Sequence, residues 1–381
     1  MGLTQDIWAN PGEHLRITHP DHPVLYTAPS VLMSTARRFL DGFPGMVTYA
    51  VKANPSEFVL TNLFAAGVSG FDVASPHEMA LVARAAPGAV MHYNNPVRSA
   101  AEILAALEHE VVSWSVDAQS ELDKILHHVD GSAEIAVRFK LPVKGAAYDF
   151  GSKFGASAEQ AVDLLQRVAR AGHVPALTFH PGTQCTDPAA WAAYIETAAQ
   201  ISAAAGVDLA RLNVGGGFPS HQIRADAPQL EQIFDTIAHS TDKAFGLNAP
   251  VLICEPGRAM VAEAYTLTTR IKAIRDGDHV FLNDGIYGGL SEAHVVGLTD
   301  RIEIWSPEGT RRNGPLGSRT VFGPTCDSID KLPGQVMLPA DLQEGDYVMF
   351  KGAGAYSTAT ATRFNGYGAL EQATVLSLIS R

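Results

Sequence analysis

The chain has 381 residues, with 28 Lys and Arg against 40 Asp and Glu, so its formal net charge is −12. This acidic balance argues against non-specific binding of nucleic acid or of anionic membranes. Three cysteines are too few for a disulfide framework, which indicates a reducing, cytoplasmic compartment. The first residues lack the basic and apolar regions of a signal peptide, and no run reaches the roughly 18 apolar residues of a membrane span.

Short apolar runs alternate with Ala- and Leu-rich stretches of helical period between about residues 30 and 260. Helix-like stretches include residues 75–86, 100–109 and 156–171. The apolar runs, eight in number, are residues 47–51, 70–74, 90–93, 112–116, 135–139, 176–179, 211–214 and 251–254. This alternation predicts an α/β fold with a (β/α)8 TIM-like barrel, and a doubly wound open sheet is the alternative.

The sequence pattern changes after about residue 262, where short strand-like runs are separated by Gly, Pro and Asp turns. We expect a C-terminal, mostly β domain with strands at residues 265–274, 279–282, 301–305, 320–322 and 347–350. The first 25 or so residues lack the alternation of strand-like and helix-like stretches that predicts the barrel, and we expect them to join the β domain. The predicted domains are therefore a barrel over 27–262 and a β domain over 1–26 and 263–381.

Polar residues end or follow every predicted barrel strand. In chain order they are Lys52, Asp72, Asn94, Asp117, Arg138, His180, the glycines at 215–217 and Glu255. In barrels of this kind the reactive groups lie at the C-terminal ends of the strands. A polar residue at all eight ends therefore predicts a functional rim.

Lys52 is either a solvated rim charge or a desolvated amine that can form Schiff bases. The run Gly215, Gly216 and Gly217 and the pair Gly257 and Arg258 follow the seventh and eighth strands, where barrels commonly bind phosphate. A flexible turn is the alternative for the glycines. We favour a phosphate site, which in turn favours a desolvated Lys52.

Glu255 stands beside this phosphate site, and a carboxylate there could keep a pyridine nitrogen protonated. An ion pair with Arg258 is the alternative. His180 could pack on a flat cofactor or be a structural histidine, and Thr183 could bind phosphate or cap the following segment. Lysine, phosphate cradle, acid and flat ring together indicate pyridoxal 5′-phosphate.

The sequence resembles the type III pyridoxal-phosphate-dependent decarboxylases, which include ornithine, lysine, arginine and diaminopimelate decarboxylases, and among these it looks most like ornithine decarboxylase. The resemblance covers about residues 25–370. It rests on the motifs YAVKAN (49–54), FDVAS (71–75), HPGTQ (180–184), GGGFP (215–219), EPGR (255–258), DGIYG (284–288), GPTCDSID (323–330), GAY (354–356) and FNG (364–366).

The resemblance implies a role for each of these residues. Lys52 would form a Schiff base with the cofactor, His180 would stack on its ring and Glu255 would pair with its nitrogen. Asp72 and Arg138 would lie near the imine and the ring oxygen, with Glu78 behind them. The phosphate would be held by Gly215, Gly216, Gly217, Gly257, Arg258, Thr183 and Tyr356. No metal is expected.

In the family the active site forms between the subunits of a homodimer. Cys326 and Asp327 would then come from the partner chain, Cys326 as proton donor and Asp327 as the group that meets the distal ammonium of the substrate. Phe364 would line the same wall, and Tyr287 could either line that pocket or be a packing residue. From the residues alone, Cys326 could also be a buried structural thiol, and Asp327 and Asp330 could cap a segment.

One departure affects the expected substrate. Relatives that decarboxylate ornithine carry a further acid about ten residues beyond the DGIYG motif, where this chain has Val295 and Val296. Glu292 is the one carboxylate nearby. We expect decarboxylation of ornithine, with lysine next. The alternatives are arginine, diaminopimelate or a noncanonical amino acid, an alanine-racemase-like enzyme, or a non-catalytic regulatory homologue.

Overall fold

The structure is a computed structural model that describes residues 7–142, 153–220, 229–297 and 301–379. Its described residues divide into two compact units, one spanning residues 35–260 and the other combining residues 1–34 with 261–381. Among the residues with a described structure, no helix is long and apolar enough to cross a lipid bilayer.

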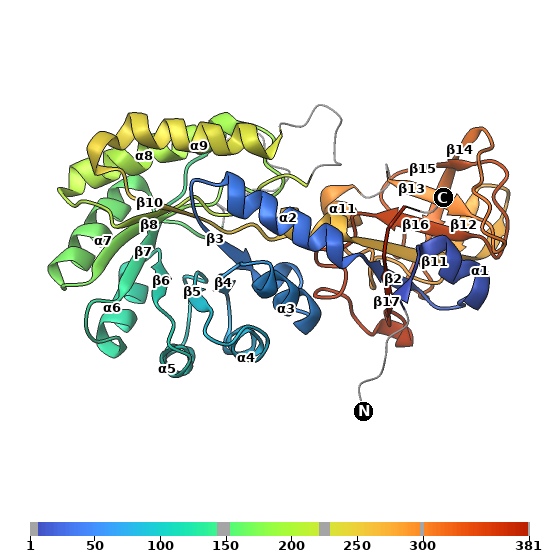
Figure 1. The fold of residues 1–381 in the computed structure, drawn as a ribbon, viewed down its shortest axis with the longest axis horizontal. Helices are drawn as coiled ribbons and strands as arrows, with labels where there is room; N and C mark the ends of the chain where they lie inside the picture. The colour runs from blue at the N-terminus through green and yellow to red at the C-terminus, as the bar shows by residue number, and fades with distance from the viewer. Residues whose placement is uncertain (1–6, 143–152, 221–228, 298–300, 380–381) are drawn as a thin grey trace. The chain divides into compact units, whose positions relative to one another are not determined.

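The first unit contains a closed barrel of parallel strands in which the last strand, β10, pairs with the first, β3 (Figure 1). The strands are β3 (Gly45–Ala50), β4 (Gly70–Val73), β5 (Val90–Tyr93), β6 (Ser113–Val116), β7 (Glu134–Arg138), β8 (Val174–Thr178), β9 (Arg211–Asn213) and β10 (Val251–Cys254). The predicted (β/α)8 barrel is therefore confirmed, and the open sheet is wrong. Each predicted apolar run overlaps one of these strands.

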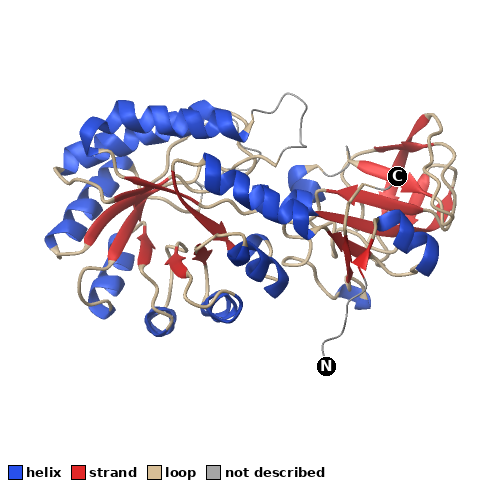
Figure 2. Ribbon diagram, viewed as in Figure 1, coloured by secondary structure: helices blue, strands red, loops and turns tan. Residues whose placement is uncertain are grey.

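Helices alternate with the strands and form an outer layer around them (Figure 2). They are α2 (Pro29–Gly42), α3 (Glu57–Ala65), α4 (Pro76–Ala85), α5 (Ala100–Glu108), α6 (Gln119–His128), α7 (Ala158–Arg170), α8 (Pro188–Ala205), α9 (Leu230–Phe245) and the short α10 (Arg258–Val261). Local chemistry sets their starts. The hydroxyls of Ser99 and Ser157 accept the N–H of the residue three positions on, as N-caps do.

The second unit is built on a sheet that joins the two ends of the chain. Within the described residues it has nine strands, β1 (Ile7–Trp8), β2 (Val24–Thr27), β11 (Tyr265–Arg275), β12 (His279–Leu282), β13 (Ile302–Trp305), β14 (Leu316–Phe322), β15 (Val336–Pro339), β16 (Tyr347–Lys351) and β17 (Glu371–Val375). The N-terminal strands β1 and β2 both pair with β17, and β2 also pairs with β11. The helices α1 (Pro11–Thr18) and α11 (Ala293–Val296) belong to this unit.

The sequence prediction for this sheet was incomplete. It missed β1, β2, β15 and β17. In β15 buried and exposed residues alternate over only four positions, and β17 begins with the exposed Glu371 and Gln372. Such short, half-polar strands form because partner strands supply the hydrogen bonds, which no local pattern reveals.

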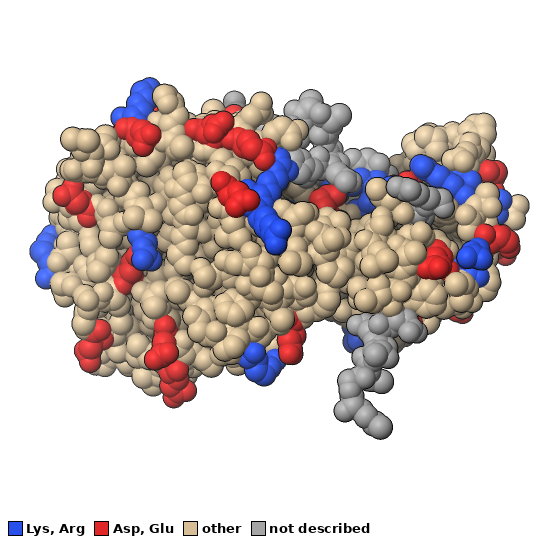
Figure 3. All heavy atoms as spheres, viewed as in Figure 1, with Lys and Arg blue, Asp and Glu red and all other residues tan. Residues whose placement is uncertain are grey.

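On the face drawn in Figure 3, acidic and basic side chains lie scattered, singly or in small groups, among uncharged residues. One pair on the barrel unit is Arg38 with Glu231, whose atoms Nε and Oε1 lie 2.5 Å apart.

Candidate active site

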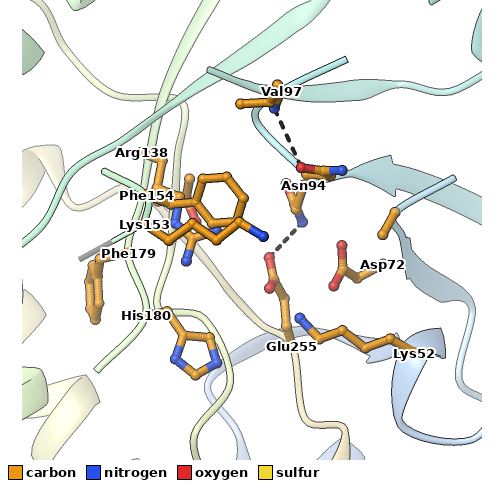
Figure 4. A pocket seen from close by; sticks show the side chains of 13 residues that line it. Lys52, Asp72, Asn94, Val97, Arg138, Lys153, Phe154, Phe179, His180 and Glu255 are labelled. Carbon is orange, nitrogen blue, oxygen red and sulfur yellow. Dashed lines mark hydrogen bonds between the residues drawn. The ribbon is translucent and has the colours of Figure 1, made fainter. Parts of the chain in front are cut away.

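A cavity of about 480 Å³ opens at the C-terminal ends of the barrel strands. Its size is that of a small-molecule site. Predicted rim residues converge there from separate strands, as Figure 4 shows. The side chains that line it are Lys52, Asp72, Ala74, Asn94, Asn95, Val97, Arg138, Lys153, Phe154, Thr178, Phe179, His180 and Glu255.

Lys52 lies in the single turn Val51–Ala53 that follows β3. Its side chain extends toward Glu255 and Asp72 in Figure 4. The turn is fixed from both sides, because Ala50 N–H donates to the Pro256 carbonyl at 3.2 Å and the Tyr49 hydroxyl donates to the Asn54 carbonyl at 3.1 Å. Lys52 is exposed in the structure, and its role as a desolvated, imine-forming amine stays a prediction.

Two buried carboxyl groups face this lysine. Burial, followed by the charge of Asp72, raises the pKa of Glu255 to about 8. Burial likewise raises the pKa of Asp72, while the charge of Lys52 and hydrogen bonds from Asn94 oppose that rise. Glu255 Oε1 accepts hydrogen bonds from the Asn94 side chain at 2.6 Å and from the Asn213 side chain. The cavity floor therefore holds an acid that keeps its proton near neutral pH.

His180 lies two residues past the end of β8 and is held as a neutral ring. Its Nδ1 accepts the Gly182 N–H at 3.0 Å. Burial, helped by the positive charges of Lys52 and Arg138, lowers the pKa of His180 well below its usual value. A neutral, flat ring that borders the cavity can lie against an aromatic cofactor without adding charge.

The glycine run after β9 is required by close packing. Gly215 and Gly217 have φ values of 70° and 81°. A Cβ on Gly215 would meet the Phe179 carbonyl oxygen at 2.2 Å, and one on Gly216 would meet the Glu255 carbonyl oxygen at 2.6 Å. The run therefore brings the ends of β8, β9 and β10 into contact, and its role toward phosphate remains a prediction.

The other barrel residues predicted to hold the phosphate lie on two different segments. Gly257 packs against the end of β3, where an added Cβ would lie 3.2 Å from the Ala50 Cβ, and Arg258 begins α10. Thr183 lies in the loop after His180 and does not cap α8, because the N-cap of that helix is Asp187.

Arg138 lies at the end of β7 and lines the cavity. Its guanidinium carbon lies 5.2 Å from the centre of the Phe154 ring. Burial lowers the pKa of Arg138, and the charges of Glu255, Asp117 and Asp72 oppose that shift. Glu78, on α4, feels the charges of Asp72 and Lys52 and accepts the Ala74 N–H at 2.7 Å, which fixes the start of that helix.

A second cluster of predicted residues lies in the other unit. The Tyr287 hydroxyl donates to Asp327 Oδ2 at 2.6 Å, and its ring lies 4.9 Å from that of Phe364. Cys326 is exposed, so the alternative of a buried structural thiol is wrong. Its backbone N–H donates to Asn365 Oδ1 at 3.1 Å. The DGIYG, CDSID and FNG motifs thus meet in one place.

Asp330 holds the two loops of this cluster together. It is 1% exposed, and its carboxylate accepts the Ile286 N–H at 3.0 Å, the Thr325 N–H at 3.1 Å and the Thr325 hydroxyl at 2.7 Å. Gly285 and Gly323 make room for it, since a Cβ on either would lie 2.2 Å from Asp330 Oδ1. Asp330 therefore ties together the loops that carry Tyr287 and Cys326, a larger role than the cap that its sequence suggested.

The two remaining predicted residues also belong to the second unit. Glu292 occupies the position before α11, without a side-chain cap, and Val295 and Val296 end that helix. Val295 is 44% exposed. Tyr356 adopts a positive φ of 66°, which is uncommon for a residue with a side chain.

Sequence reasoning missed part of the site. Asn213 was counted within an apolar strand, and Asn94 was noted at the rim without a role. Lys153 and Phe154 were not singled out, yet both line the cavity. The signal for Asn213 was its position two residues before the glycine run, inside a strand that is otherwise apolar.

The cavity residues fit an aldehyde-bearing pyridine cofactor. Lys52 offers an accessible amine, the buried acid Glu255 can share a proton with a ring nitrogen, and His180 offers a flat neutral surface. The fold and this donor set define the class of barrel enzymes that bind pyridoxal phosphate.

Comparisons with known proteins agree. The family described as "Pyridoxal-dependent decarboxylase, pyridoxal binding domain" matches residues 31–262, and the chain belongs to this family. The lysine/ornithine decarboxylase of Selenomonas ruminantium is 34% identical over 329 residues, covering 84% of this chain and 81% of that protein. The protein is therefore a pyridoxal-phosphate-dependent amino-acid decarboxylase of the family that contains the ornithine, lysine and arginine enzymes.

Solved structures show the same fold. The lysine/ornithine decarboxylase of Vibrio vulnificus complexed with cadaverine has a TM-score of 0.78 at 30% identity, covering 92% of this chain and 94% of that one. The arginine decarboxylase of Paramecium bursaria Chlorella virus has a TM-score of 0.84 at 23% identity, covering 95% and 98%. At that identity the second likeness concerns the fold alone.

Proposed function

We propose that the enzyme decarboxylates a basic L-amino acid, with ornithine the leading substrate and lysine next, and releases CO₂ and a diamine. The observation that carries this proposal is the carboxylate of Asp327 beside the exposed Cys326. The hydrogen bond from Tyr287 lowers the pKa of Asp327, so the group stays anionic and can pair with a distal ammonium. The similarity to lysine/ornithine decarboxylases supports the same substrates.

Within this proposal each predicted site residue has a role. Pyridoxal phosphate, when bound, supplies the electron sink that weakens the bond to the substrate carboxylate. Lys52 anchors it through the amine, His180 covers the ring, and Glu255 shares its proton with the pyridine nitrogen. Asp72 and Arg138 set the charge around the amine. Gly215, Gly216, Gly217, Gly257, Arg258, Thr183 and Tyr356 would hold the phosphate.

We further propose that the enzyme is a homodimer in which the cluster of Cys326, Asp327, Tyr287 and Phe364 completes the cavity of the partner chain. Apolar side chains in the cluster and next to it are exposed, Phe364 by 42% and the nearby Ile329 by 59%. A partner surface would cover them. The Cys326 thiol would return a proton to the substrate carbon that loses CO₂, so that one proton is consumed for each CO₂ released.

The substrate is tested by incubating the loaded enzyme with L-ornithine, L-lysine, L-arginine and meso-diaminopimelate while CO₂ and the amine product are measured. Lys52→Ala is the inactive control. We expect the highest kcat/KM for ornithine or lysine. Preferred turnover of arginine or diaminopimelate would retain the decarboxylase and overturn the assigned substrate. The absence of CO₂ from all four would overturn decarboxylation of basic amino acids.

A further inference from the structure

Two side-chain amides from separate strands converge on one oxygen of Glu255. Asn94 directly follows β5, and Asn213 is the last residue of β9. Both donate through Nδ2 to Glu255 Oε1, Asn94 at 2.6 Å. Figure 4 shows the hydrogen bond from Asn94 to Glu255 among the side chains that line the cavity. Asn94 is 9% exposed and Asn213 is 4% exposed, so both contacts are shielded from water.

The orientation of each amide is set by its surroundings. Asn213 Oδ1 accepts the Gly215 N–H at 2.9 Å, so its NH₂ group must point toward Glu255. The Asn94 side chain and backbone also form hydrogen bonds that lower the pKa of Asp72. Asn94 therefore lies between the two buried carboxyl groups of the site.

Both described hydrogen bonds to the Glu255 carboxyl fall on Oε1, and none from a described residue falls on Oε2. Lys52, Asp72 and Arg138 act on Glu255 through charge. A side-chain NH₂ group can only donate a hydrogen bond, so Glu255 Oε1, which both amides bind, must be an acceptor. The other oxygen is then the one left to exchange a proton within the cavity that Glu255 lines.

We propose that Asn94 and Asn213 are positioning residues that clamp Glu255 through Oε1 and present Oε2 to the pyridine nitrogen of bound pyridoxal phosphate. This inference rests on the proposed pairing of Glu255 with that nitrogen, and it does not depend on which amino acid is the substrate. With the clamp in place, the affinity for the cofactor depends on the ring nitrogen. A misaligned Glu255 carboxyl group would form only a weak hydrogen bond with that nitrogen.

The test compares pyridoxal phosphate with its carbocyclic analogue, in which C–H replaces the ring nitrogen. Equilibrium binding of each to cofactor-free protein is measured by fluorescence quenching, which requires no turnover. The wild type should prefer pyridoxal phosphate. Asn94→Ala and Asn213→Ala should each reduce the ratio of the two Kd values by roughly fivefold to tenfold, the effect of losing one charge-assisted hydrogen bond.

Asn62→Ala is the matched control, because the Asn62 amide donates to the Phe58 carbonyl on α3, away from Glu255. It should leave the ratio unchanged. If an alanine variant does not fold, the isosteric Asn94→Asp or Asn213→Asp replaces the donor with an acceptor and should reduce the ratio further. A wild type without preference would overturn the pairing of Glu255 with the nitrogen, and with it the clamp. If all Asn94 and Asn213 variants kept the wild-type preference for pyridoxal phosphate over the analogue, the clamp would be wrong but the pairing of Glu255 with the nitrogen would stand.

Discussion

The hydroxyl of Tyr287 lies 2.6 Å from Asp327 Oδ2, and this contact joins two loops that lie 40 residues apart in the chain. It lowers the pKa of Asp327, and the main cause of the raised pKa of Tyr287 is the same bond. The proton therefore stays on the phenol and the negative charge on the carboxylate. If this carboxylate binds the distal ammonium of the substrate, both residues contribute to KM.

We predict that Asp327→Ala raises KM for ornithine and lysine by roughly tenfold to a hundredfold, because the bound ammonium loses its partner. Tyr287→Phe should raise KM only severalfold, since the carboxylate remains and loses one donor. Glu292→Ala is the control on the neighbouring helix and should have a smaller effect. Steady-state kinetics with both amino acids decides. Equal KM values in the wild type and Asp327→Ala would exclude Asp327 as the ammonium partner.

Lys52→Ala should abolish the visible absorbance of lysine-bound cofactor while the melting temperature of the cofactor-free protein stays almost unchanged. The side chain is exposed, so its removal leaves no buried cavity. Lys153→Ala provides the comparison, because Lys153 lines the same cavity and its Nζ lies 5.0 Å from the centre of the Phe154 ring. That variant should retain the absorbance. The reverse result would mean that the wrong lysine has been assigned.

Glu255→Gln should reduce turnover by about 10²–10³, the cost of removing one preorganised electrostatic group. It should also change how stability depends on pH. The pKa of Glu255 is about 8 in the folded protein against an ordinary 4.5, so between these values the folded state holds a proton that the unfolded state has lost. This group therefore makes the free energy of unfolding fall as pH rises, by up to about 1.4 kcal/mol per pH unit.

Chemical denaturation of cofactor-free protein across this pH range measures that slope. Glu255→Gln has no proton to lose there and should give a flatter profile. Asp72→Asn is an informative companion, because the charge of Asp72 contributes to the raised pKa of Glu255. Identical profiles for the wild type and Glu255→Gln would show that Glu255 is already ionised across the range.

Asp330→Asn should lower the free energy of unfolding by about 1–3 kcal/mol, because an amide cannot accept all three hydrogen bonds from Ile286 and Thr325. The loops that carry Tyr287 and Cys326 should loosen, so turnover should fall and the Cys326 thiol should react faster with a labelling reagent. Ser328→Ala, at an exposed position of the same loop, should change neither. If Asp330→Asn unfolded like the wild type and its Cys326 thiol were labelled at the wild-type rate, Asp330 would not hold the loops together.

The barrel could be predicted from the sequence because its strands are buried runs separated by helices of regular period. Its rim could be predicted for the same reason, since parallel strands bring their ends together. The role of Asn213 could not, because its bond to Glu255 spans 42 residues and depends on the pairing of β9 with β10. Asp330 reaches Ile286 across 44 residues, and no local pattern marks such a contact.

Active sites that are shared between subunits can be detected by mixing two inactive variants. If Cys326 serves the cavity of the partner chain, Lys52→Ala and Cys326→Ala are each inactive alone but complement each other. After random exchange half of the dimers are mixed, and each mixed dimer contains one site with both residues intact, so about a quarter of all sites should be active. Activity is measured after the two variants are unfolded and refolded together, with each variant refolded alone as the control. If each chain completed its own site, no mixture would regain activity, and the shared arrangement would be wrong.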